Sequence, residues 1–369
     1  MIIKVPSELV ILGIRGLPAQ YGGFETFAEN LSLYLVKRGW TVTVYCQEKG
    51  VGPIYQTEWK GVKRIHVPVK NTGALGTIIF DWKSITHSLL NGGVFLTLGY
   101  NTALFNLWLR LKGKKNLINM DGIEWRRDKW AWYEKIWLYL NERAGCLIAR
   151  HLIADHPEIK NHLATRIDAK KITMIPYGAR LVDDADVALL RKYSLEVGNY
   201  VLLIARPVPE NSILEIIQAF SDHVRHKTLV VLGKYDSENT YHSEIIGAAS
   251  DEVNFLGAVY DHETLDALRF YSCLYVHGHT VGGTNPSLIE ALGAGQPVLA
   301  HDNKFNRWVA GSGAVYFKDK NDCIKKINNL LADENALRTM SDFSRHRFNE
   351  NFTWGAILKQ YENLLHCWI

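Results

Sequence analysis

Glycines and a helix-start signature occur together in the segment 277–297, in a spacing that suits phosphate binding. Gly282 and Gly283 allow a tight turn and a close approach of the backbone to a ligand. Asn285 and Pro286 predict that a helix begins there, because asparagine caps helices and proline favours their first position. Free backbone amides at a helix start attract an anion. The segment therefore predicts a phosphate-binding loop.

Two charged side chains are expected to act at the same site. Arg206 directly follows the apolar run 200–205, and arginine can bind a diphosphate through two parallel hydrogen bonds. Glu290 lies one helical turn beyond the glycine loop, where a carboxylate could accept hydrogen bonds from ribose or sugar hydroxyls. The alternatives are a solvated surface arginine and a solvent-facing helical glutamate.

A second glycine-rich turn follows the apolar run 9–14 in the first half of the chain. Gly22 and Gly23 precede a predicted helix and offer backbone amides to an anion, and Arg15 adds positive charge. The turn does not have the GxGxxG pattern, so it gives no support to a nicotinamide nucleotide site. An ordinary loop between strand and helix is the alternative.

Carboxylates follow another apolar run, 117–120, at the end of a predicted strand. Asp121 and Glu124 stand where a general base would belong. The next residues interleave aromatic and basic side chains: Trp125, Arg126, Arg127, Lys129, Trp130, Trp132, Tyr133, Trp137 and Tyr139. A shorter basic and aromatic stretch precedes them at 108–115. The carboxylates suit acid–base chemistry, and the residues that follow them predict a surface rich in aromatic and basic side chains.

That surface has two interpretations. Tryptophan and tyrosine favour a membrane interface, where lysine and arginine contact anionic headgroups, so the segment could rest on a membrane. The alternative is an amphipathic helix with Trp130, Trp132 and Trp137 packed inside its own domain. Positive and negative charges within 121–151 nearly cancel, which keeps both interpretations open.

Several other function classes are not favoured. His277 and His279 resemble a metal pair but lack a third ligand, and the Asp184-x-Asp186 motif lies in an expected linker, so no metal site is predicted. There is no GxSxG nucleophile motif. The net charge of +4 and pI of 8.6 give too little support for a nucleic-acid partner. Five scattered cysteines, no signal peptide and no run of about 20 apolar residues indicate a cytoplasmic protein.

The elements that must position these residues alternate between strands and helices. Short apolar runs occur at 9–14, 41–45, 62–65, 94–98, 117–120, 146–149 and 172–175, and again at 200–204, 228–232, 253–256, 274–276, 298–300 and 315–317. Such alternation predicts α/β structure with mainly parallel sheets in two doubly wound, Rossmann-like domains. The domain boundary is expected within 176–199, and the ligand in a cleft between the domains.

The chain resembles the GT-B glycosyltransferases of family 4 over nearly its whole length. The resemblance rests on 253–268, on the glycine loop with Glu290 and on 352–364. Within the family, the chain is most similar to a bacterial rhamnosyltransferase-like branch. The strings GLPAQYGGFETF from Gly16, DGIEWRR from Asp121 and HGHTVGGTNPS from His277 carry this second resemblance.

The resemblance implies roles for individual residues. Glu290 matches the second glutamate of the Glu-x7-Glu motif, which holds the nucleotide ribose, whereas Gly282 stands at the first glutamate. Arg206 matches the diphosphate arginine, and Asn211 stands where the family has lysine. Catalytic roles are expected for Arg206, Asp121 and Glu290, and acceptor-side roles for Arg15, Glu124 and Arg126. Donor binding is expected at Gly22, Gly23, Asn211, His279, Gly283, Thr284, Asn285, Ser287 and Glu290.

The expected function follows from this resemblance. We expect a GT-B enzyme with an N-terminal domain at 1–180, a nucleotide-sugar domain at 181–349 and a C-terminal helix at 350–369 that returns to the first domain. The expected reaction is the transfer of L-rhamnose from dTDP-rhamnose to a lipid-linked saccharide. The resemblance implies retention of configuration and no bound metal or other cofactor. The expected location is the cytoplasmic face of an anionic membrane. A UDP- or GDP-hexose donor, a sugar-nucleotide epimerase and a non-catalytic nucleotide-binding protein remain alternatives.

Overall fold

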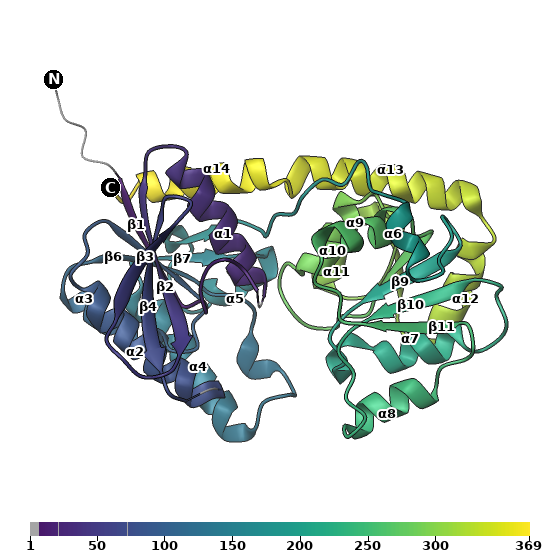
Figure 1. Ribbon diagram of the computed structural model, residues 1–369, viewed down its shortest axis with the longest axis horizontal. Coiled ribbons are helices and arrows are strands. Elements are labelled where there is room, and N and C mark those ends of the chain that lie inside the picture. Colours follow the sequence, from purple (N-terminus) through teal and green to yellow (C-terminus); the bar gives the residue numbers. More distant parts are fainter. Residues whose placement is uncertain (1–6, 21, 72) are drawn as a thin grey trace. The chain divides into compact units, whose positions relative to one another are not determined.

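The structure, a computed structural model, describes residues 7–20, 22–71 and 73–369 and divides them into two compact units (Figure 1). Unit 1 extends to Tyr177 and also includes Trp354–Ile369, whereas unit 2 is Gly178–Thr353. The chain therefore leaves unit 1 slightly before the expected boundary at 180. It returns at Trp354, after the expected start of the last segment at 350.

Unit 1 is built on an eight-stranded sheet in the order β3-β4-β2-β1-β5-β6-β7-β8. All neighbouring strands are parallel except β3, which pairs antiparallel with β4. The central strands are continuous apolar runs because helices cover both faces of a parallel sheet. The strands are β1 (Glu8–Leu12), β2 (Thr41–Lys49), β3 (Tyr55–Trp59), β4 (Val62–Val69), β5 (Val94–Leu98), β6 (Lys115–Asn119), β7 (His151–Ala154) and β8 (Ile172–Met174).

The helices of unit 1 include two that frame the candidate site, α1 and α4. They are α1 (Gly23–Val36), α2 (Gly73–Ser88), α3 (Leu107–Leu111), α4 (Trp132–Ile148), α5 (Pro157–Ala164) and α14 (Trp354–His366), with short 3-10 turns η1 (Ala103–Asn106), η2 (Glu124–Arg126) and η3 (Ala169–Lys171).

Unit 2 contains a six-stranded, fully parallel sheet in the order β11-β10-β9-β12-β13-β14. Its strands are β9 (Tyr200–Ile204), β10 (Thr228–Leu232), β11 (Val253–Gly257), β12 (Leu274–His277), β13 (Val298–His301) and β14 (Val315–Phe317). Its helices are α6 (Ala188–Arg191), α7 (Ile213–Phe220), α8 (Thr240–Gly247), α9 (His262–Phe270), α10 (Pro286–Gly293), α11 (Lys304–Ala310), α12 (Lys320–Leu331) and α13 (Glu334–Asn351), with the turns η4 (Pro209–Asn211) and η5 (Gly311–Gly313). Both units are Rossmann-like.

The last helix, α14, completes the core of unit 1. The rings of Phe27 in α1 and Tyr361 in α14 lie 4.5 Å apart. The Tyr361 hydroxyl accepts a hydrogen bond of 2.9 Å from the side-chain amide of Asn119 at the end of β6, and the Tyr34 hydroxyl donates one of 3.0 Å to Glu362. The prediction that the C-terminal helix returns to the first domain is met by these contacts.

One predicted strand is wrong. The run 146–149 forms the last turn of α4, and the strand follows it as β7 (His151–Ala154). A short apolar run cannot by itself distinguish a strand from the buried side of a helix. Here Cys146 and Ile148 continue the buried stripe of α4 that also contains Leu138. Because α4 uses this run, the polar residues after the strand are Asp155 and His156.

The order of the strands determines where each unit can bind a ligand. In unit 1 the chain reverses its direction of winding between β1 and β5, and in unit 2 between β9 and β12. Loops at the carboxyl ends of such strand pairs diverge and leave room for ligands. The loop after β1, the residues after β9 and the loop after β12 all lie at these points.

Candidate active site

The predicted phosphate loop joins β12 to α10 in unit 2. Asn285 caps α10, with its side-chain oxygen accepting hydrogen bonds from the Ser287 amide at 3.2 Å and the Ser287 hydroxyl at 3.0 Å. Pro286 occupies the first position of the helix, and Gly282 has φ of +139°, which glycine adopts readily. The helix therefore begins where the sequence predicts.

Neighbouring elements hold this loop in place. The amide and hydroxyl of Thr280 donate to the Glu210 carbonyl at 2.9 and 3.0 Å. The side-chain amides of Asn303 and Asn306 donate to the His279 carbonyl at 2.9 and 2.8 Å. At Gly278 any larger residue would meet the chain after β9, because a Cβ there would lie 2.1 Å from the Asn211 carbonyl oxygen. The loop is thus positioned before any ligand binds.

His277 and His279 stack at the start of the loop. Their ring centroids are 4.3 Å apart with an angle of 7° between the planes, and His277 is only 1% exposed. Burial lowers the pKa of His277 well below the usual range, and the nearby His279 and His301 lower it further. His277 is therefore neutral at physiological pH. No group of three or more metal-ligating side chains could hold an ion among the described residues.

Arg206 lies immediately beyond β9, and its side chain is exposed. The side chain has no hydrogen-bond or ionic partner among the residues that the structure describes. Asn211, in contrast, is 3% exposed, and its amide nitrogen donates to the Arg206 carbonyl at 2.8 Å. The Asn211 side chain therefore stabilises the backbone of the turn after β9, while the Arg206 side chain is available to a ligand.

Glu290 pairs with a buried arginine from α9. Arg269 Nη2 lies 2.5 Å from Glu290 Oε2, and the Arg269 side chain is almost fully enclosed. Glu290 itself remains partly exposed, so the pair fixes its carboxylate without hiding it. Gly283, Thr284 and Ser287 lie in the same loop and helix start. The structure therefore brings Glu290 to the predicted phosphate loop, with Arg269 as a partner that the sequence did not indicate.

The loop after β1 in unit 1 is held by carboxylates from α1. Glu25 accepts a hydrogen bond from the Arg15 amide at 3.1 Å, and Glu29 accepts one from the Ala19 amide at 2.8 Å. A Cβ at Gly22 would lie 3.2 Å from Glu25, so this carboxylate stands directly over the start of α1. A negative charge there disfavours a phosphate at Gly22 and Gly23 and suits a hydroxyl-bearing ligand. Tyr21, which belongs to the same motif, is outside the described residues.

Asp121 and Glu124 follow β6, as predicted, and have different ionisation. Burial raises the pKa of Asp121 to about 6, and the nearby Glu124 carboxylate adds to this shift. For Glu124, burial also raises the pKa, but Arg127 at 2.9 Å and Lys129 at 3.3 Å outweigh it and the net pKa is lowered. Glu124 therefore stays ionised, whereas Asp121 gains or loses its proton near pH 6. Arg126 is exposed and stacks over the Trp125 ring at 5.0 Å.

Polar residues that sequence reasoning missed lie at the same edge of the unit 1 sheet. Tyr100, after β5, accepts a hydrogen bond of 2.7 Å from the Glu124 amide through its hydroxyl. His156, after β7, is fully buried and accepts a hydrogen bond of 3.0 Å from the Glu158 amide. Both residues could have been found from the sequence by their position directly after a buried strand. For His156 this position was missed because the run 146–149 was assigned as the strand.

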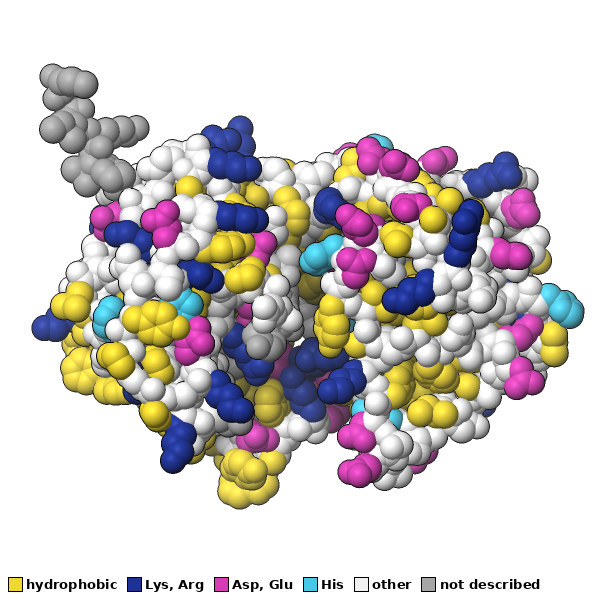
Figure 2. Space-filling view, viewed as in Figure 1, with side chains coloured by type: hydrophobic (Ala, Val, Ile, Leu, Met, Phe, Trp, Pro, Cys, Tyr) yellow, Lys and Arg dark blue, Asp and Glu magenta, His cyan; other side chains and the backbone are white. Residues whose placement is uncertain are grey.

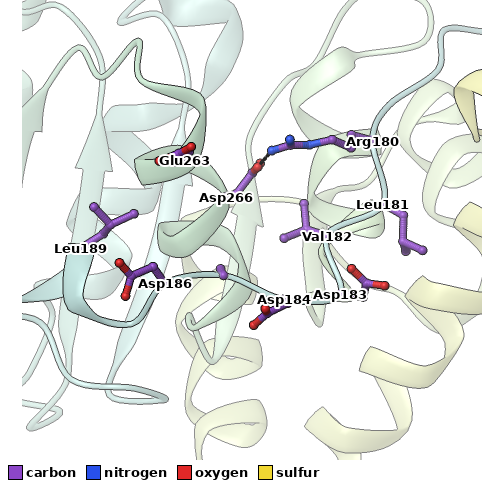
Figure 3. Close-up of a pocket in the computed structure, with 10 residues that line it drawn as sticks. Arg180, Leu181, Val182, Asp183, Asp184, Asp186, Leu189, Glu263 and Asp266 are labelled. Carbon is purple, nitrogen blue, oxygen red and sulfur yellow. Dashed lines mark ion pairs between the residues drawn. The ribbon is translucent and has the colours of Figure 1, made fainter.

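The acidic segment of the expected linker borders a pocket of about 430 Å³ in unit 2 (Figure 3). Asp183, Asp184 and Asp186 lie along its rim, and Arg180 pairs with Asp266 across it. The aspartates are spread along an extended chain in Figure 3 rather than directed at a common point. This arrangement gives Asp184 and Asp186 no shared site for an ion.

Unit 1 exposes many large apolar side chains on α2, η1, α3 and α4. We call this surface the aromatic face; it comprises Leu75, Trp82, Leu104, Leu107, Trp108, Leu111, Trp132, Tyr133, Ile136, Trp137, Leu140 and Leu147. The helices adjoin one another, since η1 contacts both α2 and α4 and the rings of Trp82 and Trp108 are 6.1 Å apart. Figure 2 shows hydrophobic side chains exposed over this part of the molecule.

The exposure of these residues bears on the interpretation in which the tryptophans pack inside their own domain. Trp132 is 75% exposed and Trp137 is 37% exposed, so they are not packed inside the domain. Trp130 is half-buried and donates a hydrogen bond to Glu124 at 3.3 Å. Among the described residues, no helix is both long and apolar enough to cross a membrane.

Comparisons with known families match the two halves of the chain separately. Residues 7–180 match a family described as a domain of unknown function (DUF1972). Residues 191–347 match the family Glycosyl transferases group 1, which covers most of unit 2. No curated protein sequence is a match.

Solved structures resemble the chain over nearly its whole length. Sucrose-phosphate synthase from Thermosynechococcus elongatus is 18% identical with a TM-score of 0.83, covering 98% of this chain and 98% of that one. HepE from Anabaena, solved with UDP and glucose, is 14% identical with a TM-score of 0.79, covering 98% and 100%. An alpha,alpha-trehalose 6-phosphate synthase from Burkholderia multivorans is 11% identical with a TM-score of 0.78, covering 99% and 97%. The likeness shows the GT-B fold.

Proposed function

We propose that this glycosyltransferase of the GT-B fold transfers a sugar from a nucleotide diphosphate donor to a lipid-linked saccharide. The observation that carries the proposal is the pre-positioned loop 278–285 in unit 2. The N-terminal end of α10 lies at this loop and attracts negative charge, and Arg206, after the neighbouring strand, adds an exposed cation that has no partner among the described residues. These groups suit an anionic diphosphate.

The proposed reaction uses electrostatic stabilisation of the leaving group. Arg206, the Gly283 amide and the N-terminal end of α10 stabilise the charge that develops on the diphosphate, which is commonly the largest catalytic contribution. Glu290 holds the nucleotide ribose from the side of α10. We assign binding of the acceptor to unit 1, where Asp121 can take a proton from the acceptor hydroxyl because its pKa lies near 6. Arg15, Glu124 and Arg126 would contact the acceptor.

We propose L-rhamnose as the sugar and dTDP-rhamnose as the donor, transferred with retention and without a metal. The support is the similarity of three motifs to a rhamnosyltransferase-like branch of family 4 and the glycine at 282, which leaves no carboxylate to bind a 6-hydroxyl. A 6-deoxy sugar has no such hydroxyl. A UDP-hexose donor is the second candidate, because the similar HepE structure contains UDP and glucose.

The aromatic face supports a lipid-linked acceptor. Many large apolar side chains exposed on adjoining helices indicate an interaction site, and tryptophan and tyrosine favour the headgroup region of a bilayer. Exposed cations border it, including Lys112, Lys115 and Arg143, and each surface cation contributes about 1 kcal/mol toward an anionic bilayer. We propose that the protein works at the cytoplasmic surface of an anionic membrane, in the assembly of a surface polysaccharide.

A donor screen tests the proposed function. Calorimetry with dTDP-rhamnose, UDP-glucose and GDP-mannose would rank the donors, and product analysis with lipid-linked saccharides would follow transfer. Tightest binding and turnover with dTDP-rhamnose is the expected result, and nuclear magnetic resonance of the product would report retention. Turnover of a sugar nucleotide without any acceptor would indicate an epimerase, and binding without any turnover would indicate a non-catalytic protein.

A further inference from the structure

Two basic side chains lie just beyond the carboxyl ends of two neighbouring strands of unit 2, at equivalent positions. β9 and β10 pair in parallel with Ile204 opposite Leu232. Arg206 follows Ile204 by two residues, and Lys234 follows Leu232 by two residues. Both side chains are exposed, and neither has a hydrogen-bond, ionic or ring partner within the part of the chain that the structure describes.

The turn that carries Lys234 is held on both sides. Before it, the Gly233 amide donates to the Gly257 carbonyl at 3.0 Å, and a Cβ at Gly233 would lie 2.7 Å from the Ala205 carbonyl oxygen. After it, the Tyr235 ring packs edge-on against Phe255 with centroids 5.0 Å apart. The backbone of Lys234 is therefore fixed beside the end of β9, while its side chain extends into solvent.

Several other cations of unit 2 form ion pairs within the fold. Examples are the pairs Arg269–Glu290, Arg307–Asp302 and Lys326–Asp322. The acid nearest to Lys234 in sequence is Asp236, whose carboxylate accepts a hydrogen bond of 3.0 Å from the Glu238 amide. Two positive charges at adjacent strand ends repel each other, and an anion bound between them removes that repulsion.

We propose that Lys234 binds the diphosphate of the nucleotide donor together with Arg206. This inference rests on the proposed function and adds a donor-binding residue to it. The strand order β10-β9-β12 places Arg206 between Lys234 on one side and the loop 278–285 on the other. A diphosphate carries more than one negative charge, so a single arginine leaves it incompletely neutralised. Asn211 is uncharged and bound to the Arg206 carbonyl, so Lys234 supplies the second positive charge.

Three variants test this assignment by calorimetry with UDP and dTDP. Lys234→Met should weaken nucleotide binding about 10-fold or more and reduce its dependence on salt, because one charge-assisted hydrogen bond is lost. Lys234→Arg should retain most of the affinity. Lys227→Met is the matched control: it precedes the same strand, with its ammonium 3.2 Å from the Gly198 carbonyl, and should leave binding unchanged.

The outcomes separate this inference from the function on which it rests. Wild-type affinity and wild-type salt dependence in Lys234→Met would overturn the role of Lys234 and leave the proposed transferase intact. A wild-type protein that binds neither nucleotide would overturn both. Equal losses in Lys234→Met and Lys227→Met would also overturn the assignment, since they would indicate a general charge effect. Thermal melts of the two Lys234 variants should match wild type, because the Lys234 side chain has no partner among the described residues.

Discussion

Arg269 and Glu290 form an ion pair in which one partner is enclosed and the other can still meet a ligand. Their side chains are 7% and 35% exposed, respectively. Removing one partner of a buried pair leaves an uncompensated charge and costs about 3–5 kcal/mol, and partial exposure reduces that cost. The same carboxylate therefore contributes both to the stability of unit 2 and, in our proposal, to nucleotide binding.

The two contributions can be separated by two substitutions of Glu290. Glu290→Gln keeps an oxygen that accepts from Arg269, so it should bind nucleotide about 10-fold more weakly with a small loss of stability. Glu290→Ala should also lower the free energy of unfolding by about 1–3 kcal/mol, because Arg269 loses its partner. Calorimetry and denaturant titration measure the two effects. Parent-like nucleotide affinity in Glu290→Gln would refute the ribose role.

Arg206→Ala should reduce transfer by about 10²–10³-fold, the usual effect of losing one preorganised donor to a developing negative charge. The melting temperature should not change, since the Arg206 side chain is exposed. Steady-state kinetics with the best donor gives the test, and Arg206→Lys, which keeps the charge without the bidentate geometry, is the matched control. Near-normal turnover by Arg206→Ala would remove this residue from the mechanism.

Asp121 makes stability depend on pH in a defined direction. Its pKa is raised from 3.8 to about 6, so folding favours the protonated acid. The stabilisation is complete below about pH 4 and is lost as the pH rises through about 6. Asp121→Asn should therefore be more stable than wild type at pH 8, by about 1–2 kcal/mol, and similar to it at pH 4. Asparagine also tolerates the positive φ of 52° at this position.

Denaturant titrations at the two pH values measure this difference, with Glu124→Gln for comparison. An Asp121→Asn variant that is less stable than wild type at pH 8 would show that the carboxylate is not destabilised by burial. If Asp121 takes the acceptor proton, wild-type activity should fall below about pH 6, and the variant should lack this fall.

Membrane binding should depend on the aromatic face. The double variant Trp108→Ser, Trp132→Ser removes two exposed rings, so flotation with anionic vesicles at low salt should fall severalfold while the melting temperature stays unchanged. Leu90→Ser, an 85% exposed apolar residue outside this face, is the control and should float like wild type. A wild-type protein that does not float with anionic vesicles would contradict the membrane proposal and favour a soluble acceptor.

Strands that are continuous apolar runs between turn residues could be predicted well from the sequence. The predicted runs 94–98, 200–204 and 228–232 have the bounds of β5, β9 and β10. The edge strand β3 was missed because its residues are mostly exposed and form no apolar run. The run 146–149 failed because burial on one side of a helix produces the same local pattern.

Within the candidate site, the sequence predicted the features that are local. The cap at Asn285 depends on residues that follow it directly in the chain, so its spacing is visible in the sequence. Pairings such as Arg269–Glu290, or Glu25 with the Arg15 amide, join residues from different elements and depend on tertiary packing. The register that aligns Arg206 with Lys234 requires the strand order, which local patterns do not specify.

Because α14 packs against α1 and β6, unit 1 is made of two separate segments of the chain. The sequence of unit 2 lies between these two segments. A growing polypeptide on the ribosome can therefore fold unit 2 while the core around Phe27 still lacks Tyr361. Domains that are continuous in sequence generally fold as they emerge, first one and then the next. Here the core of unit 1 can be completed only after unit 2 has been synthesised, and a premature stop codon near residue 354 would leave that core exposed.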